Sequence, residues 1–559
     1  MFYKNNFSSS KILAAVLPRF VLSAAGILFI ITALSFLVPL VFSFVPLFSS
    51  RFDFTHITGG LTQDKAGAVI RILRITLFTV TQAFFSALLA VGIGLPSAYF
   101  CAKKNFKGRK FLLALSSVPL CVPAIIIALA FILFFGNNGI INSVLKQLFK
   151  SDKPIISFLF TMRGVILVHA FYNFPIAMRT IADVWGTLNE DEEHAAILLG
   201  AGKFRIFKTI TLPALMNAIA ASFLLIFLFC FFSFIIVLLF GGLGITTLEV
   251  ELYKTARASL NMNLAAKISL IEIIIASAVI MVYANIQKKV EGINQNLKQK
   301  NKRTELKGCA EKIIFMVTIF IILLFLIAPL FSIFLRSVYN VNYTSVFDKF
   351  ISLKAWKKVL YSSVFWKSVK TTIWTGLCTA SVTLITSLFF AYLTIFSNLK
   401  KTAAAVPYFP LAVSSVMLGF GWMLLRPNGS IAMLIFAQSA LAWPFAWTQI
   451  QTSLLRIPQN IFNAALLFSV NKKDAFFRTL LPLCKHGIFS AFAFVFAISA
   501  GDASLPIILN IRQFQNLPLL LYDYSASYRF AESAAVAVIL ALLTGFVFFL
   551  QDGVLLKDE

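Results

Sequence analysis

The chain of 559 residues is too hydrophobic for a water-soluble globular protein. Residues of the AVILMFWYC set make up 59%, charged residues 13%, and the mean hydropathy is +0.88. Soluble domains carry roughly 25% charged residues, so a cytosolic enzyme, a secreted disulfide scaffold and a disordered chain are excluded. The 49 Lys and Arg against 22 Asp and Glu leave a net charge of +27. In a membrane protein this excess is expected in loops beside anionic lipid headgroups, so we expect lipid and no nucleic acid as a partner.

Twelve apolar runs are each long enough to cross a bilayer, whose core of about 30 Å takes roughly 20 residues. They cover residues 20–44, 75–100, 111–135, 163–181, 215–240, 267–287, 313–337, 369–396, 406–425, 431–450, 486–510 and 530–551. The first run is too long for the hydrophobic region of a signal peptide and is predicted to be a span. The sequence therefore predicts an all-α polytopic membrane protein with about twelve transmembrane helices.

The chain divides into two related halves, residues 1–287 and 313–559, joined by a basic linker at 288–312. Each of three dipeptides has a counterpart 269 residues later: Phe174-Pro175 with Trp443-Pro444, Ala195-Ala196 with Ala464-Ala465, and Leu212-Pro213 with Leu481-Pro482. A constant separation indicates a duplication, and six spans per copy make the two repeats parallel. With both termini and the linker in the cytoplasm, Lys and Arg are in modest excess on the cytoplasmic side.

The loop at residues 189–213 follows the fourth span. It begins with acidic residues, and the sequence after them predicts a helix, a turn and a second helix. Asn189 is a plausible N-cap and Glu192 occupies the capping-box position, so a short helix is predicted to run to Leu199. Gly200 is expected to end it in the left-handed conformation. A second amphipathic turn is predicted from Lys203 back into the membrane.

The spacing of this loop resembles the EAA motif of ABC importer permeases. The motif positions are filled by Ala195, Ala196, Gly200, Ile210, Leu212 and Pro213, while His194 takes the glutamate position and Glu193 precedes it. The second copy, residues 458–482, keeps Ala464, Ala465, Leu481 and Pro482, has Asn463, Ser469 and Thr479 in place of Glu, Gly and Ile, and places Pro458 as the first helical residue. The degenerate second loop is therefore expected to couple more weakly, or through shape alone.

This resemblance implies the type I ABC importer permease fold in the cytoplasmic (inner) membrane. It also implies two ABC ATPase subunits, each engaging one loop and binding ATP and Mg²⁺, and an extracytoplasmic solute-binding protein. The chain itself is not expected to be an enzyme, nor to bind a cofactor or a metal. Its GAGK fragment at Gly200–Lys203 lacks the spacing and the Ser or Thr of a phosphate-binding loop, and its six cysteines have no paired spacing.

Segments 163–175, 240–253 and 501–529 resemble the thiamine permeases, so thiamine or its phosphates are the expected substrates. Ferric iron importers, which are related fused permeases, are the alternative. A twelve-span secondary transporter is the alternative of another class, but the loop KKNFKGRK after the second span lacks the aspartate expected there.

Three polar residues within predicted spans are candidates for the substrate pathway. His169 and Asn173 share a helix face, and Asp502 falls inside the eleventh run, where an ionisable group is costly and often functional. For each, a hydrogen bond that packs helices together is the competing interpretation. Glu272 is expected to make an interhelical contact of the same kind.

Overall fold

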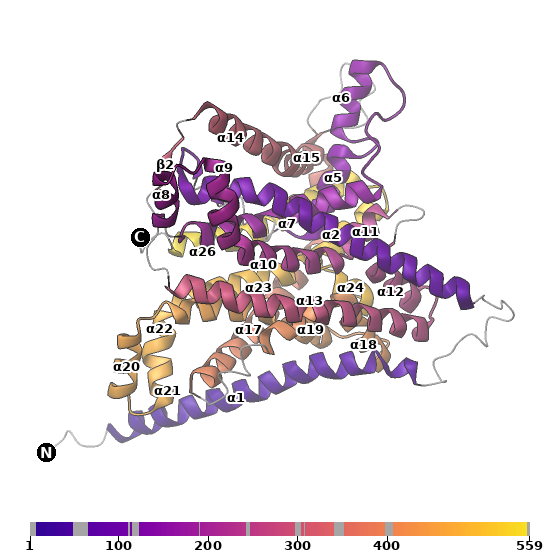
Figure 1. Cartoon of the computed structure of the whole chain (residues 1–559). Helices are drawn as coiled ribbons and strands as arrows, with labels where there is room; N and C mark the ends of the chain where they lie inside the picture. Colours follow the sequence, from indigo (N-terminus) through magenta and orange to yellow (C-terminus); the bar gives the residue numbers. More distant parts are fainter. Residues whose placement is uncertain are drawn as a thin grey trace. The chain divides into compact units, whose positions relative to one another are not determined.

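The computed structural model describes residues 7–48, 65–109, 112–113, 122–188, 190–241, 246–296, 303–306, 308–339, 352–396 and 406–555. Helices make up nearly all of this structure (Figure 1). Ten are long and apolar enough to span a membrane, or twelve if each of two bent pairs counts as one span. Every predicted run overlaps one of these twelve, so the all-α prediction of about twelve spans is confirmed.

The two bent pairs depart from the simple spans that the sequence predicts. Residues Val406–Ala412 and Ser415–Leu425 meet at 84°, and Lys472–Leu483 and Lys485–Gly501 meet at 74°. In the first pair, the Ser414 hydroxyl accepts a hydrogen bond from Met417 N at 2.9 Å and so starts a new helix after the bend. A hydropathy pattern measures apolar length and does not detect such a local cap.

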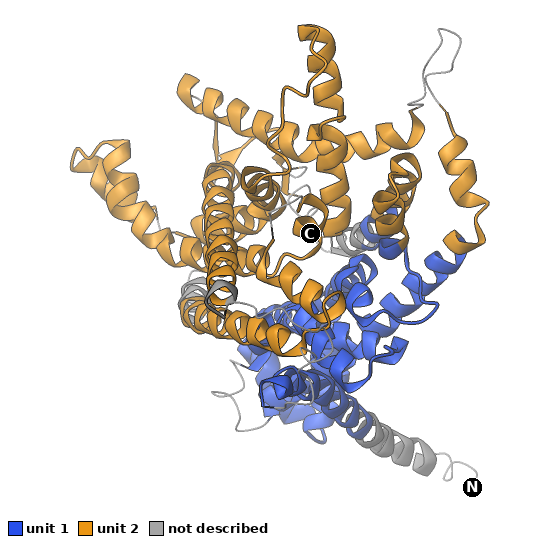
Figure 2. Ribbon diagram, turned by 90° about the vertical axis from the view of Figure 1, so that its right-hand side faces the viewer, with its two compact units in different colours: residues 1–49, 366–519, 542–559 blue, residues 50–365, 520–541 orange. Residues whose placement is uncertain are grey.

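The chain forms two compact units that each draw on both halves of the sequence (Figure 2). Unit 1 contains residues 1–49, 366–519 and 542–559, and unit 2 contains residues 50–365 and 520–541. The first span therefore belongs to the unit built mainly from the second repeat, and the seventh span to the unit built mainly from the first. These contact units divide the chain differently from the sequential halves expected from the repeats.

Unit 1 is built around long helices from the second repeat, with the first span packed on them. Its elements are α1 (Phe7–Phe42), η1 (Val45–Leu47), most of α17 (Ser363–Phe396), η6 (Val406–Ala412), α18 (Ser415–Leu425), α19 (Ile431–Leu455), α20 (Gln459–Phe468), α21 (Lys472–Asp474), η7 (Ala475–Leu480), α22 (Leu481–Leu483), α23 (Lys485–Gly501), α24 (Ser504–Leu509), the start of α25 (Leu517–Ala526) and the end of α26 (Phe530–Leu555).

Aromatic side chains fasten α1 to this unit. Phe29 contacts both Phe390 and Trp443, with ring centroids 6.0 and 5.7 Å away, and these two rings also contact each other at 5.0 Å. Further along α1, the ring of Phe36 contacts Phe409 edge-on at 5.8 Å. Apolar helices in lipid associate through close packing of this kind rather than through release of water.

Unit 2 contains the first repeat without its first span, the linker strand and the seventh span, together with residues 520–541, which are most of α25 and the start of α26. Its elements are α2 (Lys65–Lys103), β1 (Lys104–Asn105), α5 (Ala124–Phe135), α6 (Ile140–Phe149), α7 (Met162–Trp185), α8 (Asp191–Leu198), α9 (Lys203–Ile206), η4 (Phe207–Thr211), α10 (Leu212–Phe231), α11 (Ile235–Phe240), α12 (Leu248–Arg257), α13 (Met262–Asn296), β2 (Thr304–Glu305), α14 (Cys309–Ile322), η5 (Leu323–Ile327), α15 (Ala328–Val338) and α16 (Lys354–Leu360).

The helices of unit 2 pack closely where small residues face one another. A Cβ added at Gly94 of α2 would lie 2.8 Å from Ala177 Cβ of α7, so this contact requires glycine. The seventh span joins the unit through the stacked rings of Phe171 and Phe325, 4.6 Å apart, and through Ser332 Oγ, which donates to the Ala130 carbonyl at 3.2 Å.

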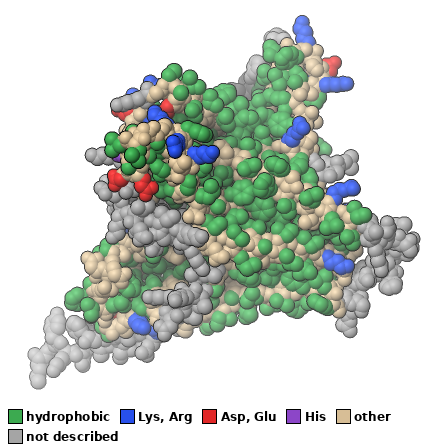
Figure 3. All heavy atoms as spheres, in the orientation of Figure 1, with side chains coloured by type: hydrophobic (Ala, Val, Ile, Leu, Met, Phe, Trp, Pro, Cys, Tyr) green, Lys and Arg blue, Asp and Glu red, His purple; other side chains and the backbone are tan. Residues whose placement is uncertain are grey.

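Hydrophobic side chains also cover the outside of the spans. Figure 3 shows a face on which they predominate and on which charged side chains gather toward the margins. Ile30, Leu73, Met281 and Phe320 are each more than half exposed. Such a surface would be unstable in water and suits lipid acyl chains.

The duplication is visible in the backbone. The starts of α7 and α19, of α10 and α22, and of α12 and α25 are each separated by the same 269 residues as the sequence repeats. Both repeats also have a π-helical turn directly before Leu212 and Leu481, at Phe207–Thr211 and Ala475–Leu480. The two repeats therefore share their local geometry despite limited identity.

Candidate functional site

The first candidate loop contains the short helix that the sequence predicts. Helix α8 spans Asp191–Leu198, and its first turn carries three acids, which favour the positive end of the helix dipole. The N-cap position is occupied by Glu190, without a side-chain cap, and not by Asn189, which lies outside the described residues. The expected capping box is therefore wrong, because the helix begins one residue later than the pattern indicates.

Gly200 ends this helix as predicted. Its φ is +82°, in the left-handed region, and a Cβ there would have no neighbour within 4 Å. The Ala201 amide donates to the Ala196 carbonyl and the Gly200 amide to the Ile197 carbonyl, both at 2.9 Å. Glycine is thus required by the backbone conformation and not by space.

The chain returns toward the span where the sequence predicts it. Helix α9 starts at Lys203, and the π-helical turn that contains Ile210 leads directly into α10. Leu212 and Pro213 are the first two residues of α10 and directly follow the π-helical turn.

Glu193 faces inward and holds α8 to two neighbouring helices. Its carboxylate lies 3.7 Å from Lys103 Nζ at the end of α2 and accepts a hydrogen bond from Thr211 Oγ1 at 2.9 Å. Lys103 also pairs with Glu190 at 2.9 Å. His194 and Ala195 are exposed and Ala196 is partly exposed. The residue at the glutamate position of the motif therefore points outward, while its predecessor anchors the helix.

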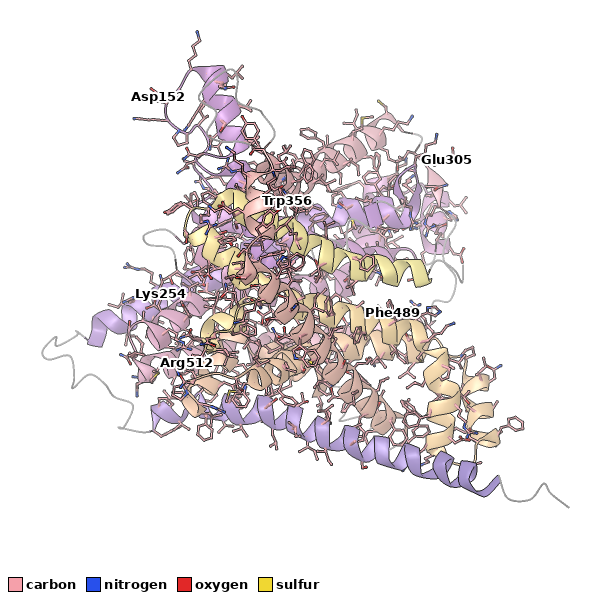
Figure 4. All side chains as sticks on the ribbon, turned by 180° about the vertical axis from the view of Figure 1, so that it is seen from behind. Asp152, Lys254, Glu305, Trp356, Phe489 and Arg512 are labelled. Atoms are coloured by element: carbon pink, nitrogen blue, oxygen red, sulfur yellow. The ribbon has the colours of Figure 1, made fainter. Side chains whose placement is uncertain are left out.

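The linker is joined to the same place. Thr304–Glu305 forms strand β2, which pairs in parallel with β1, directly after Lys103. Figure 4 labels Glu305 on this strand. Glu311, at the start of α14, lies 2.8 Å from Lys104 Nζ and accepts a hydrogen bond from the Tyr99 hydroxyl at 2.8 Å. Close by, burial and the neighbouring Arg303 lower the pKa of Arg109. Two adjacent residues thus make these contacts: Lys103, the last residue of α2, contacts α8, and Lys104 of β1 contacts the linker.

The second candidate loop has the same helix with a different ending. Helix α20 spans Gln459–Phe468, so Pro458 is its N-cap and not the predicted first helical residue, and the helix starts one position later than expected. Asn463 accepts a hydrogen bond from Gln459 Nε2 at 3.2 Å, Ala464 is partly exposed and Ala465 is buried. Ser469 is extended, with φ −89° and ψ 145°.

Asn471 starts the next turn of this loop, because its side chain accepts from the Asp474 amide at 2.9 Å. Leu481 and Pro482 begin α22. The second loop therefore turns without a left-handed residue.

Both loops present unpartnered apolar side chains at their tips. Leu198 and Leu199 are each 88% exposed and Phe204 79%, while Leu467, Phe468 and Val470 reach 81%, 90% and 91%. Clusters of this kind next to charged residues mark surfaces that bind another protein.

His169 and Asn173 belong to a buried hydrogen-bonded cluster in unit 2. His169 Nδ1 lies 3.0 Å from Gln82 Oε1, and its Nε2 lies 2.7 Å from Ser233 Oγ. Asn173 Nδ2 donates to the His169 carbonyl at 2.9 Å. Gln82 also donates to the Cys230 carbonyl at 2.9 Å.

Unit 1 contains the repeat-related cluster. Gln438, Ser499 and Asp502 stand 269 residues after His169, Cys230 and Ser233. Gln438 Nε2 donates to Asp502 Oδ2 at 3.0 Å, and Ser499 Oγ donates to Gln438 Oε1 at 2.7 Å. The contacts among the three candidates and their neighbours are those of the helix-packing interpretation, and a role in the substrate pathway stays a prediction.

Asp502 does not lie inside a continuous helix, contrary to the prediction. Helix α23 ends at Gly501, and Asp502 Oδ1 accepts from the Ser504 amide at 2.9 Å, which starts α24. Its carboxylate is therefore partly stabilised by the helix break that it helps to form.

Reasoning from the sequence missed Lys103, Thr211, Gln438 and Ser233. The first two are distant in sequence from the acids that they contact. Gln438 could have been found by adding 269 to the number of His169, and Ser233 by subtracting 269 from that of Asp502, because both repeats have polar residues at these positions.

Comparison with known proteins agrees with this architecture. The profile of the family "Binding-protein-dependent transport system inner membrane component" matches residues 90–291 and 394–557. The chain is 24% identical over 508 residues to the "Thiamine transport system permease protein ThiP" of Brucella abortus (strain 2308), covering 87% of this chain and 88% of that protein.

Two further relatives extend the comparison. The protein of the same name from Escherichia coli (strain K12) is 24% identical over 489 residues, covering 84% of this chain and 87% of that protein. A "Putative 2-aminoethylphosphonate transport system permease protein PhnU" of Salmonella typhi is 28% identical over 213 residues, 38% of this chain and 74% of that protein. With the family profile matched twice, the chain belongs to the inner membrane components of binding-protein-dependent transport systems.

Proposed function

We propose that the chain is the fused permease of an ABC importer that brings thiamine, or its phosphates, across the cytoplasmic membrane. The observation that carries the transport role is the pair of repeat-related helices α8 and α20, each with an exposed apolar tip. Two equivalent docking helices suit two copies of the same ATPase subunit, one bound to each helix. The relatives that match over most of their length carry the name of a thiamine permease, which supports the substrate.

Each loop engages one ABC ATPase subunit in this proposal. The residues of the first site are Glu193, His194, Ala195, Ala196, Gly200, Ile210, Leu212 and Pro213. Those of the second are Asn463, Ala464, Ala465, Ser469, Leu481 and Pro482. Closure of the ATPases around ATP and Mg²⁺ moves the loops, and each loop passes the motion to the span that follows it through a π-helical turn. Both termini and the linker lie on the ATPase side.

A solute-binding protein delivers the substrate on the opposite side, and the chain itself supplies the path. His169, Asn173 and Asp502 remain candidates for that path. The anionic form of Asp502 would favour a cation such as thiamine.

Uptake by the assembled complex tests this proposal. The chain is reconstituted in liposomes with its ATPase and binding protein, and labelled thiamine is measured inside with ATP or with a non-hydrolysable analogue. We expect uptake that requires ATP and the binding protein. Uptake of ferric iron in place of thiamine would overturn the substrate, and uptake driven by an ion gradient without the ATPase would overturn the importer class.

A further inference from the structure

A groove of about 590 Å³ lies among three membrane-spanning helices of unit 1. Its lining comes from α17, α23 and the part of α26 that belongs to this unit, and every side chain that lines it is hydrophobic. Figure 4 locates α23 by its labelled residue Phe489. The volume lies within the range of roughly 300–1,000 Å³ that is typical of small-molecule sites. The three helices therefore leave room for a ligand.

The groove follows the direction of the helices. Each helix supplies a pair of lining residues four positions apart, which places both on one face of that helix. The pairs are Ile373 with Leu377, Phe492 with Phe496, and Leu542 with Phe546. Each pair extends along its helix by about 6 Å, because each residue adds about 1.5 Å. A ligand in the groove therefore lies parallel to the spans, in the direction that lipid acyl chains take.

Close packing forms the floor of the groove, and its rim is open. Phe496 is buried, and a Cβ added at Gly376 of α17 would lie 2.9 Å from its ring. On the rim, the side chains of Leu542 and Phe546 are each more than half exposed. A ligand can thus enter from the surface of the spans without separating α17 from α23.

The two repeats can be aligned at one wall of the groove. Thr79 and Thr372 are equivalent, because each accepts a hydrogen bond from the first amide of the repeat-related helices α12 and α25, at 3.0 and 2.9 Å. Counting five residues onward from each threonine pairs Phe84 of the first repeat with Leu377 of the second.

The first repeat fills this position with an aromatic ring of its own. Phe84 packs edge-on against Phe223, with ring centroids 5.4 Å apart. The residue that stands 269 positions after Phe223 is Phe492, which lines the groove. The second repeat therefore keeps one ring of this pair and has the smaller Leu377 in place of the other.

The chemistry of the lining decides which ligand fits. A charged or hydrogen-bonding solute would find no polar side chain in the lining, and the loss of its hydration would be costly. Apolar cavities also do not hold water. A hydrocarbon chain needs no polar partner, and the bilayer around the spans supplies such chains at high concentration.

We propose that this groove binds a membrane phospholipid by one of its acyl chains. The chain packs on Phe492 and Phe496 and takes the place that the ring of Phe84 has in the first repeat. It also contacts Leu377 and Leu542, and so joins α17 to α26 through packing alone, which is the main source of association between apolar helices in lipid.

Photolabelling of the full chain in nanodiscs tests the site without any transport assay. The nanodiscs contain a phosphatidylethanolamine with a photoreactive diazirine on one acyl chain, and labelled peptides are identified by mass spectrometry. We expect the peptides that contain Leu377, Phe496 and Phe546 to be labelled at least about threefold more than the peptide that contains Met281, an exposed residue of α13. A bound chain stays at its site, whereas lipids at an open surface exchange.

Two substitutions on α17 separate the groove from the rest of the surface. Leu377→Phe supplies the ring of the first repeat and should lower the labelling of the groove at least about threefold. Ile385→Phe is the matched control, because it makes a similar change at an exposed position two turns further along α17, and it should leave the labelling unchanged.

Thermal unfolding of the delipidated chain in detergent gives a second measurement. Added phosphatidylethanolamine should raise the unfolding midpoint saturably by at least about 2 °C in the wild type and in Ile385→Phe, and by less in Leu377→Phe. Wild-type groove peptides labelled no more than the Met281 peptide would overturn the proposal, even if Leu377→Phe fails to fold. Labelling that thiamine displaces would also overturn it, as would a Leu377→Phe variant that keeps both the labelling and the rise.

Discussion

Glu193, which anchors α8, lies one residue before the glutamate position of the motif, which is occupied by His194. Neighbouring residues on a helix point about 100° apart, so the outward His194 and the inward Glu193 cannot exchange roles. The inward acid meets Lys103 and Thr211, and thereby fixes how α8 is presented. The outward position is left free to contact a partner.

Glu193→Ala should weaken binding of the ATPase about two- to fivefold, since a partly exposed ion pair contributes about 0.5–1 kcal/mol. Affinity is measured by titrating labelled ATPase onto permease in nanodiscs. Glu192→Ala, at an exposed position of the same turn, serves as the control and should bind normally. A larger loss for His194→Ala than for Glu193→Ala would show that the motif position, and not the anchor, dominates.

Gly200→Val should weaken ATPase binding about five- to thirtyfold, because a side chain in the left-handed region costs about 1–2 kcal/mol and α8 would end differently. The variant should still insert, since nothing crowds the site. Gly202→Val is the matched control: Gly202 is equally uncrowded, but its φ of −70° suits any residue. Co-purification of the ATPase with each variant decides the matter, and equal effects at the two glycines would refute the backbone explanation.

At the scale of elements, the two loops have similar helices and similar continuations into the next span, but their helices end in different ways. Helix α8 stops at a left-handed glycine, whereas α20 ends at an extended serine and the chain restarts at a cap formed by Asn471. Both then pass through a π-helical turn into the next span. The second copy of the motif therefore departs from the first because its loop uses a different turn after the helix. Both loops nevertheless have an exposed apolar tip.

Ser469→Gly restores the motif residue but should not strengthen the second loop. Ser469 has an extended backbone, so glycine gains no conformation there and adds entropy to the unfolded loop, at a cost of up to about 1 kcal/mol. ATPase affinity should be unchanged or fall by up to about fivefold, measured with the same titration. Improved binding would mean that the loop can adopt the left-handed ending of α8.

Elements were easier to predict from the sequence than the contacts between them. Long apolar runs predict spans. A glycine at position 200, directly after a predicted helix, indicates a left-handed backbone, because few other residues adopt that conformation. The pairing of Lys103 with Glu193, and of Glu311 with Lys104, depends on how distant segments pack. The helix break at Asp502 was missed for a related reason, since one side-chain hydrogen bond, from the Ser504 amide to Asp502 Oδ1, starts a new helix within an unbroken hydropathy pattern.

At the scale of the whole molecule, each compact unit needs segments from both halves of the chain. Unit 1 holds α1 through Phe29 and Phe36, and unit 2 holds the seventh span through Phe325 and Ser332. Aromatic pairs contribute about 0.5–1.5 kcal/mol each, so several together hold a helix without a covalent link. The linker is then not required to keep the halves together.

Two separately expressed fragments, residues 1–302 and 303–559, should therefore assemble when they are produced in the same cell. An affinity tag on one fragment should retain the other, because the shared units survive the cut. Phe29→Ala with Phe36→Ala should lower the retained fraction, whereas Ile30→Ala, on the exposed side of α1, should not. Either fragment produced alone should accumulate poorly, since the surface that its missing span covers is left open. Fragments that purify separately in full yield, without binding each other, would show that each half folds as an independent domain.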